Sequence, residues 1–203
     1  MRRSILWLAI LATACGGEGV QGEGPGSGDE TQQAAQLLPS RTQPEGLDFL
    51  LFGVDEQDVR LSDFRGQPVI LSFFYRSCPD ANMCPMLLSK LQEVAKGVGE
   101  KAPETEVIAI SFDPKNDTPE NLAIFSQSKD LKFRVLTGHP DDIAVIARDK
   151  FGITYEEKAP ALFDHNMKTF VIDENGELVQ TFPGSRWEPS DIVRVAEKLT
   201  AGE

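Results

Sequence analysis

The sequence predicts an α/β domain with a central, mostly parallel sheet, a C-terminal antiparallel hairpin and flanking helices. Two apolar runs rich in β-branched and aromatic residues, 68–75 and 106–112, have the composition of strands buried on both faces. Segments whose apolar residues recur at helical spacing follow such strands, and this alternation favours a parallel sheet. The Asn175-Gly176 pair, between two further β-rich runs, is a strong hairpin signal.

The expected elements follow one another without any internal repeat. Pro85 suits the first turn of a helix, Thr118 followed by Pro119 starts another, and Gly152 ends a third. The predicted segments are two short strands joined by an acidic turn (47–67), a strand (68–75), a helix (85–98), a strand (106–112), a helix (118–128), a strand (133–138), a helix (140–152), the hairpin (168–182) and an amphipathic helix (188–200).

The N-terminal region has the pattern of an export signal. Two arginines precede an apolar run that is shorter than the ~20 residues needed to span a bilayer. The stretch "LATAC" is similar to a bacterial lipobox, which predicts a signal peptide at 1–14 and lipidation of Cys15. Residues 15–45 are glycine-rich and read as a flexible tether to a domain at 46–203. The alternative is an ordinary signal cut near Ala14 that leaves Cys15 as a free thiol.

The net charge of the chain and its predicted export limit the functions that it can have. A net charge of −12 argues against a nucleic-acid partner and gives no support for binding an anionic membrane through charge. We expect an exported bacterial membrane lipoprotein that faces the periplasm or the extracytoplasmic side and is held to the membrane through its lipid anchor. Export implies an oxidising compartment, in which a disulfide can persist.

Cys78 and Cys84 remain once Cys15 carries lipid, and the pair fits a redox couple, a metal site or a structural staple. One bridge is unnecessary for a domain of this size, which makes the staple the weakest of the three. Both cysteines follow an apolar strand and precede a helix, where sites of α/β sheets lie. A helix N-terminus favours thiolate, the form that both disulfide exchange and soft-metal binding require.

The two histidines differ in their surroundings. His165 lies just ahead of the hairpin, where it could either serve the cysteine site or form a hydrogen bond to nearby backbone. His139 lies in a polar turn before a helix and reads as a solvated turn residue. A metal site would use such an imidazole, whereas a purely redox pair has no need of it.

Three stretches together resemble the SCO/SenC family: "LSDFRGQPVILSFFYRSCPDANMCP", "SFDPKNDTPE" and "DHNMKTFVIDENGELV". Members of this family are membrane-attached, thioredoxin-like copper proteins that help to assemble the binuclear copper centre of cytochrome c oxidase. The similarity extends from Asp48 to about Leu199, with the stretches in the order of the family. It therefore implies a thioredoxin-like fold, in which the loop before the hairpin faces the cysteines.

By position, the resemblance implies that Cys78, Cys84 and His165 are ligands of copper, as Cu(I) or Cu(II). The paired acids of the family fall on Asp113 and Asp117, which either form a partner surface or only shape a turn. The usual motif is C-x-x-x-C-P, and "CPDANMCP" has two more residues. The longer loop contains Met83, a residue type that packs more often than it binds copper.

The resemblance implies a lipid-anchored metallochaperone. It would deliver copper to the copper-receiving subunit of cytochrome c oxidase or to another periplasmic copper protein. The alternative is a thiol–disulfide oxidoreductase in which Cys78 and Cys84 are the redox-active pair and act on cysteines of an exported partner. A third possibility is a thioredoxin-like binding module whose surface, rather than its cysteines, is used.

Overall fold

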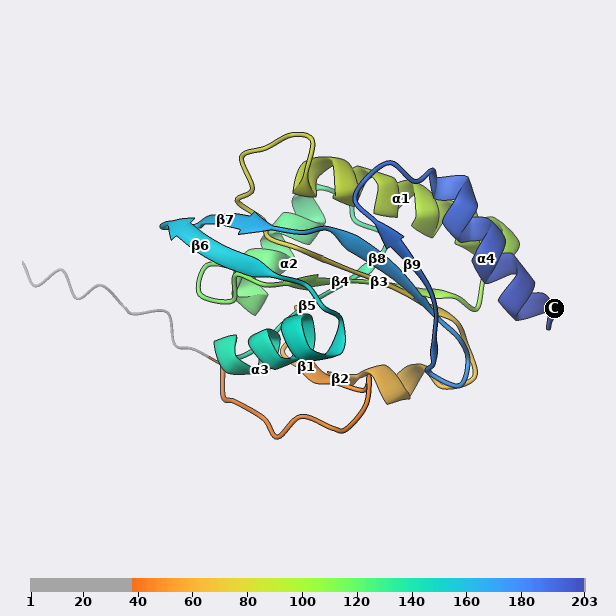
Figure 1. Cartoon of the computed structure of the whole chain (residues 1–203), viewed down its shortest axis with the longest axis horizontal. Coiled ribbons are helices and arrows are strands. Elements are labelled where there is room, and N and C mark those ends of the chain that lie inside the picture. Colours follow the sequence, from red (N-terminus) through yellow and green to blue (C-terminus); the bar gives the residue numbers. More distant parts are fainter. Residues whose placement is uncertain (1–37, 203) are drawn as a thin grey trace, which may run out of the picture. The chain divides into compact units, whose positions relative to one another are not determined.

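A computed structural model describes residues 38–202, which form a seven-stranded sheet with helices packed against it (Figure 1). The predicted signal peptide, the predicted lipidation site Cys15 and most of the predicted tether lie outside these residues. The strands of this sheet are β1 (Leu50–Gly53), β2 (Asp58–Arg60), β3 (Val69–Phe74), β4 (Glu106–Ser111), β5 (Arg134–Thr137), β8 (Lys168–Ile172) and β9 (Leu178–Pro183). The α-helices are α1 (Cys84–Lys101), α2 (Pro119–Ser128), α3 (Pro140–Ala144) and α4 (Pro189–Ala201).

The strand order is β2-β1-β5-β4-β3-β8-β9, and it confirms the predicted fold class. The three central strands β5, β4 and β3 are parallel, as the alternation of strands and helices predicts. The β8–β9 hairpin adds to β3 in antiparallel fashion, and β1 and β2 extend the other edge of the sheet, also antiparallel. Gly176 in the hairpin turn has a φ of +76°, a conformation that glycine adopts without strain.

Strand β3 is buried along its whole length because different elements cover its two faces. Phe74 stacks on Phe125 of α2 at a centroid distance of 6.3 Å. On the opposite face, Phe73 packs against Phe151 at 5.6 Å and against Phe170 of β8 at 6.3 Å. The carboxyl end of β3 therefore has a fixed position in the centre of the molecule, and the cysteine loop begins there.

The helix signals in the sequence have the expected local effects. Pro85 lies in the first turn of α1, and the Thr118 hydroxyl accepts a hydrogen bond from the backbone N–H of Asn121 at the start of α2. The predicted helix over 140–152 is α3 followed by a π-helical turn, Val145–Lys150. Among the described residues, no helix is long and apolar enough to cross a membrane.

A second, two-stranded sheet was not expected from the sequence. It consists of β6 (Tyr155–Ala159) and β7 (Leu162–His165), which pair antiparallel before the hairpin. Most residues of β6 are exposed and charged, so the segment lacks the alternation that marks a half-buried strand. His165 is consequently the last residue of a strand, whereas the sequence indicated a loop.

The folded unit also begins earlier than Gly46. Asp142 accepts hydrogen bonds from the Ser40 hydroxyl at 2.9 Å and from the Arg41 backbone N–H at 2.8 Å. The Lys150 ammonium donates to the carbonyl of Pro44 at 2.6 Å. The C-terminal part of the predicted tether therefore lies against the domain, because its backbone has fixed polar partners there.

Candidate metal centre

Cys78, Cys84 and His165 come together at the carboxyl end of β3. Cys78 lies in the loop after the strand, Cys84 is the first residue of α1, and His165 ends β7. The two Sγ atoms and a ring nitrogen all lie within 4.8 Å of one another. The residues are 9%, 1% and 8% exposed, respectively, and both cysteines are free thiols. The fold thus assembles three metal-ligating side chains from segments that are distant in the sequence.

The spacing of these atoms suits a shared metal ion. Sulfur and nitrogen ligands at the distances found around zinc, with trigonal or tetrahedral angles, would be about 3.6–3.8 Å apart. The Cys84 Sγ atom and the His165 Nε2 atom are 3.7 Å apart, which fits this range. The two separations that involve the Cys78 Sγ atom are at most 4.8 Å. Two thiolates and an imidazole are a suitable donor set for copper and for zinc.

His165 is held in the form that binds metals. Its Nδ1 atom lies 3.0 Å from the carbonyl oxygen of Asn166, and a carbonyl can only accept, so Nδ1 carries the proton. Nε2 is then the free nitrogen, and it faces Cys84. Burial lowers the pKa of His165, which favours the neutral ring. The rings of Tyr75 and Phe112, with centroids 5.7 and 4.9 Å from the imidazole, pack against it.

The protonation of Cys84 differs from the expectation. Its position at the start of α1 predicts a stabilised thiolate, but burial raises the pKa of this thiol far above its usual value. The negative charge of Cys78, once ionised, adds to this shift. Loss of solvation therefore outweighs the backbone hydrogen bonds that lower this pKa, and it favours the protonated thiol. Burial also raises the pKa of Tyr75, which lies beside both sulfurs, to about 12.

The longer cysteine loop closes on itself through Asp80. The carboxylate of Asp80 accepts from the backbone N–H of Asn82 at 2.8 Å, and its carbonyl accepts from the N–H of Met83 at 3.0 Å. The Cys78 thiol lies 3.8 Å from the same carbonyl. The two additional residues are thus absorbed in a tight turn that keeps the sulfur atoms close. Met83 is partly buried and packs against the hydrophobic core.

Two hollows reach the candidate site from different sides. A cavity of about 480 Å³ between α1 and α2 is lined by Cys84, with Leu88 and Phe125 among its apolar wall residues. A more open and more polar hollow of about 600 Å³ includes His165 and Asp164 in its lining. A ligand from another molecule therefore has two directions of approach.

The remaining candidate residues have structural roles. The His139 ring accepts the backbone N–H of Asp141 at 3.3 Å and caps α3, as a turn residue would. Asp113 is 2% exposed and Asp117 is fully buried, so neither carboxylate can form a partner surface. They shape the turn between β4 and α2, and burial raises the pKa of Asp113 to about 6. Sequence patterns gave no role to Tyr75, although it ends the apolar run before the cysteines.

The fold and this Cys-Cys-His group define a thioredoxin-like domain with a candidate soft-metal centre. The model of the SCO1/SenC family matches residues 39–201, and the chain therefore belongs to this family. An SCO2-like protein of Rickettsia typhi is 32% identical over 124 residues. The match covers 58% of this chain and 60% of that protein, so the chain spans less than two thirds of its relative.

Solved structures agree with the assignment. ScoI of Bradyrhizobium japonicum, solved with copper bound, has a TM-score of 0.65 and 26% identity, and covers 75% of this chain and 97% of its own. BsSco, described as having a disulfide switch and as a member of the Sco family of cytochrome c oxidase assembly proteins, has a TM-score of 0.66. It is 20% identical over 77% of this chain and 93% of its own, a level that supports the fold.

The shifted thiol yields a testable prediction. In a Cys78→Ser variant, desolvation of Cys84 remains, so its thiolate should form only well above the ordinary thiol range. The measurement is the ultraviolet thiolate absorbance as a function of pH. The Cys78→Ser/Cys84→Ser double variant supplies the baseline, which removes the contribution of Cys15. A Cys84 thiolate that forms near or below the ordinary thiol pKa would show that the helix dipole prevails.

Proposed function

We propose that this protein is a membrane-anchored copper metallochaperone that assists assembly of a copper centre, with cytochrome c oxidase as its receiving complex. The observation that carries the proposal is the convergence of Cys78, Cys84 and His165 at metal-ligand spacing. Family membership and a relative solved with copper bound support copper as the ion. Lipidation of Cys15 would hold the domain at the outer side of a bacterial membrane.

The ligand set suits transfer as well as binding. Two thiolates hold Cu(I), and the imidazole of His165 adds a donor that suits Cu(II). Three protein ligands leave a coordination position for a ligand of the partner, so the ion can pass by ligand exchange. The hollows beside Cys84 and His165 give such a ligand access. When bound, copper would take the place of the thiol protons, and His165 would have no proton to lose at its free nitrogen.

A thiol–disulfide oxidoreductase is the second candidate, because Cys78 and Cys84 are free thiols close enough to form a bridge. Two features favour copper. A buried thiol with a raised pKa is a poor nucleophile for disulfide exchange. A redox pair also has no use for an imidazole whose free nitrogen lies 3.7 Å from one sulfur.

The contribution of His165 can be tested by its removal. Loss of a residue that only contacts a metal ligand typically lowers metal affinity by ~10–100-fold. Because His165 would be a ligand itself, His165→Ala should lower Cu(II) affinity by at least that factor, and should lower Cu(I) affinity less. Competition titrations and the Cu(II) absorption spectrum measure both effects. His139→Ala is the matched control, because that ring caps α3 away from the cysteines. An unchanged Cu(II) spectrum in His165→Ala would exclude the three-ligand site and leave the redox pair.

Oxidation should compete with copper. To form a disulfide, the two sulfur atoms must approach from within 4.8 Å to about 2.05 Å, and the same lone pairs then no longer serve a metal. We expect protein with a verified Cys78–Cys84 bridge to bind no copper, and reduction to restore binding. Metal analysis after gel filtration measures both states. Tight copper binding by the fully bridged protein would contradict this site assignment.

The anchor is tested at Cys15. Cys15→Ser should abolish lipid attachment, so the protein should move from the membrane fraction to the soluble fraction or remain unprocessed. Fractionation and intact mass of the mature protein measure this. Cys78→Ser is the control and should stay with the membrane. A mature wild-type protein that begins at another residue and carries no lipid would rule out the lipoprotein assignment.

A further inference from the structure

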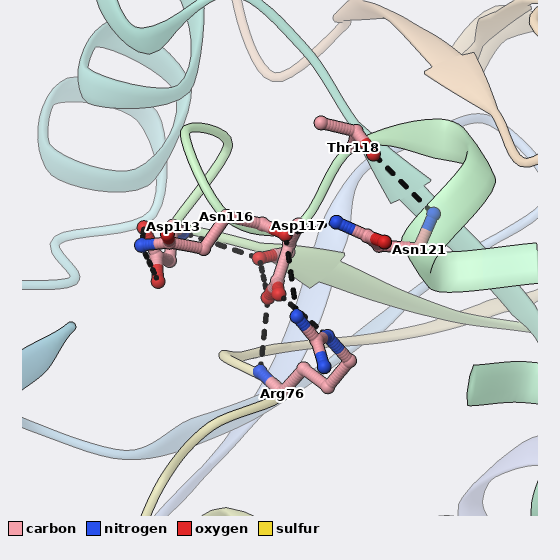
Figure 2. Close-up of polar contacts among 7 residues, drawn as sticks. Arg76, Asp113, Asn116, Asp117, Thr118 and Asn121 are labelled. Atoms are coloured by element: carbon pink, nitrogen blue, oxygen red, sulfur yellow. Dashed lines mark hydrogen bonds and ion pairs between the residues drawn. The ribbon is translucent and has the colours of Figure 1, made fainter. Parts of the chain in front are cut away.

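A buried carboxylate lies behind the cysteine loop. Asp117 is fully buried in the turn between β4 and α2. It accepts a hydrogen bond from the Ser111 hydroxyl at 2.6 Å and from the backbone N–H of Arg76 at 2.9 Å. Figure 2 shows the Arg76 side chain directed at this carboxylate. A buried charge is tolerated only with such partners, so the contact is strongly determined.

Arg76 supplies most of the groups that compensate the buried charge of Asp117. The Nε atom of Arg76 forms an ion pair with the second oxygen of Asp117 at 3.2 Å, and its Nη2 atom donates to the carbonyl of Asn116 at 3.4 Å (Figure 2). Arg76 thus binds the turn through its peptide and its guanidinium together. Arg76 is also the second residue before Cys78.

This contact is the polar attachment of the cysteine loop. Residues 75–83 connect β3 to α1, and the hydrogen bonds centred on Asp80 remain inside the loop. The loop's end residues Tyr75 and Met83 accept the N–H groups of Phe163 and Leu87. Between these ends, and within residues 38–202, the only hydrogen bonds to another part of the fold go to Asn116 and Asp117. The start of the loop is therefore fixed at Arg76, and Cys78 follows at a short distance along the chain.

We propose that Asp117 is a positioning residue for Cys78. By holding the peptide of Arg76, it sets where the loop begins and thereby the distance of the Cys78 sulfur from Cys84 and His165. Cys84 and His165 need no such help, because α1 and β7 hold them. Cys78 is the one of the three that lies in a loop, and this loop is the element that Asp117 fixes. The copper readout rests on the proposed function, whereas the disulfide readout does not.

The decisive variant is Asp117→Asn. In asparagine, an NH₂ group replaces one of the two carboxylate oxygens. This NH₂ group would face a group of Arg76 or Ser111 that now donates a hydrogen bond to Asp117, so at least one of these bonds is lost. In metal-free protein equilibrated with glutathione, the two thiols give two protons and two electrons to glutathione disulfide, which yields two glutathione molecules and the Cys78–Cys84 bridge. We expect the equilibrium constant of this reaction to fall by about tenfold, the loss typical of a hydrogen bond to a charged group.

Copper gives the second readout of the same variant. Cu(II) affinity should fall by ~10–100-fold, as for other outer-shell partners of metal sites, and the Cu(II) spectrum should change. Arg76→Gln keeps the peptide N–H and should show a smaller change. Ser111→Ala removes the hydroxyl that donates to Asp117 and accepts the Asp113 backbone N–H, but it leaves the Asp117 carboxylate and its bonds to Arg76 in place. It therefore tests the proposal with a milder change if Asp117→Asn does not fold.

The matched control is Asp113→Asn in the same turn. The Asp113 carboxylate binds the side-chain amide of Asn116, at 3.0 and 2.9 Å, and within the described residues has no hydrogen bond to the cysteine loop. This variant should keep the wild-type disulfide equilibrium and Cu(II) spectrum. The proposal is overturned if Asp113→Asn matches Asp117→Asn, or if a folded Asp117→Asn or Ser111→Ala protein behaves as wild type. Wild-type protein that binds no copper would contradict the proposed function, while the disulfide comparison would still decide the role of Asp117.

Discussion

Burial of β3 on both faces is the constraint on which the site depends. Its side chains are apolar except for Ser72, whose hydroxyl donates to the carbonyl of Lys168 at 2.9 Å and so leaves no unpaired polar group. A strand covered by α2 on one side and by Phe151 and Phe170 on the other cannot shift without opening the core. The cysteine loop starts where this strand ends, so the core sets the position of the loop's first residues.

The sequence predicts the parts of this arrangement that have local causes. The apolar runs of β3 and β4, the Thr118 cap and the Asn175-Gly176 turn each have the expected structure. Strands β6 and β7 have no such local signal, because β6 is charged and exposed and gains its conformation from pairing with β7. The placement of His165 beside Cys84 was indicated by the family resemblance alone, since pairs so distant in sequence leave no periodicity to detect.

The sequence does not predict the pKa of Cys84 or the burial of the aspartates, because both depend on how the folded chain packs. The position of Cys84 at the start of α1 is visible in the sequence, whereas its 1% exposure is a property of the packed fold. Burial raises the pKa of this thiol, and it outweighs the backbone hydrogen bonds that lower it. The same holds for the acids: the family resemblance left a partner surface and a turn both open, and Asp117 proves to be buried and bound to Arg76.

Burial also constrains the charge that the proposed site can hold. Without metal, neutral His165 and protonated Cys84 place no charge in the aromatic pocket, which suits its low polarity. Two thiolates with Cu(I) would carry a net charge of minus one, and the same ligands with Cu(II) would be neutral. Loss of solvation therefore acts against the reduced complex relative to the oxidised one. The Arg76 guanidinium does little to offset this, because Asp117 already neutralises it, so in this site copper retention depends on the ligands themselves more than on the surrounding field.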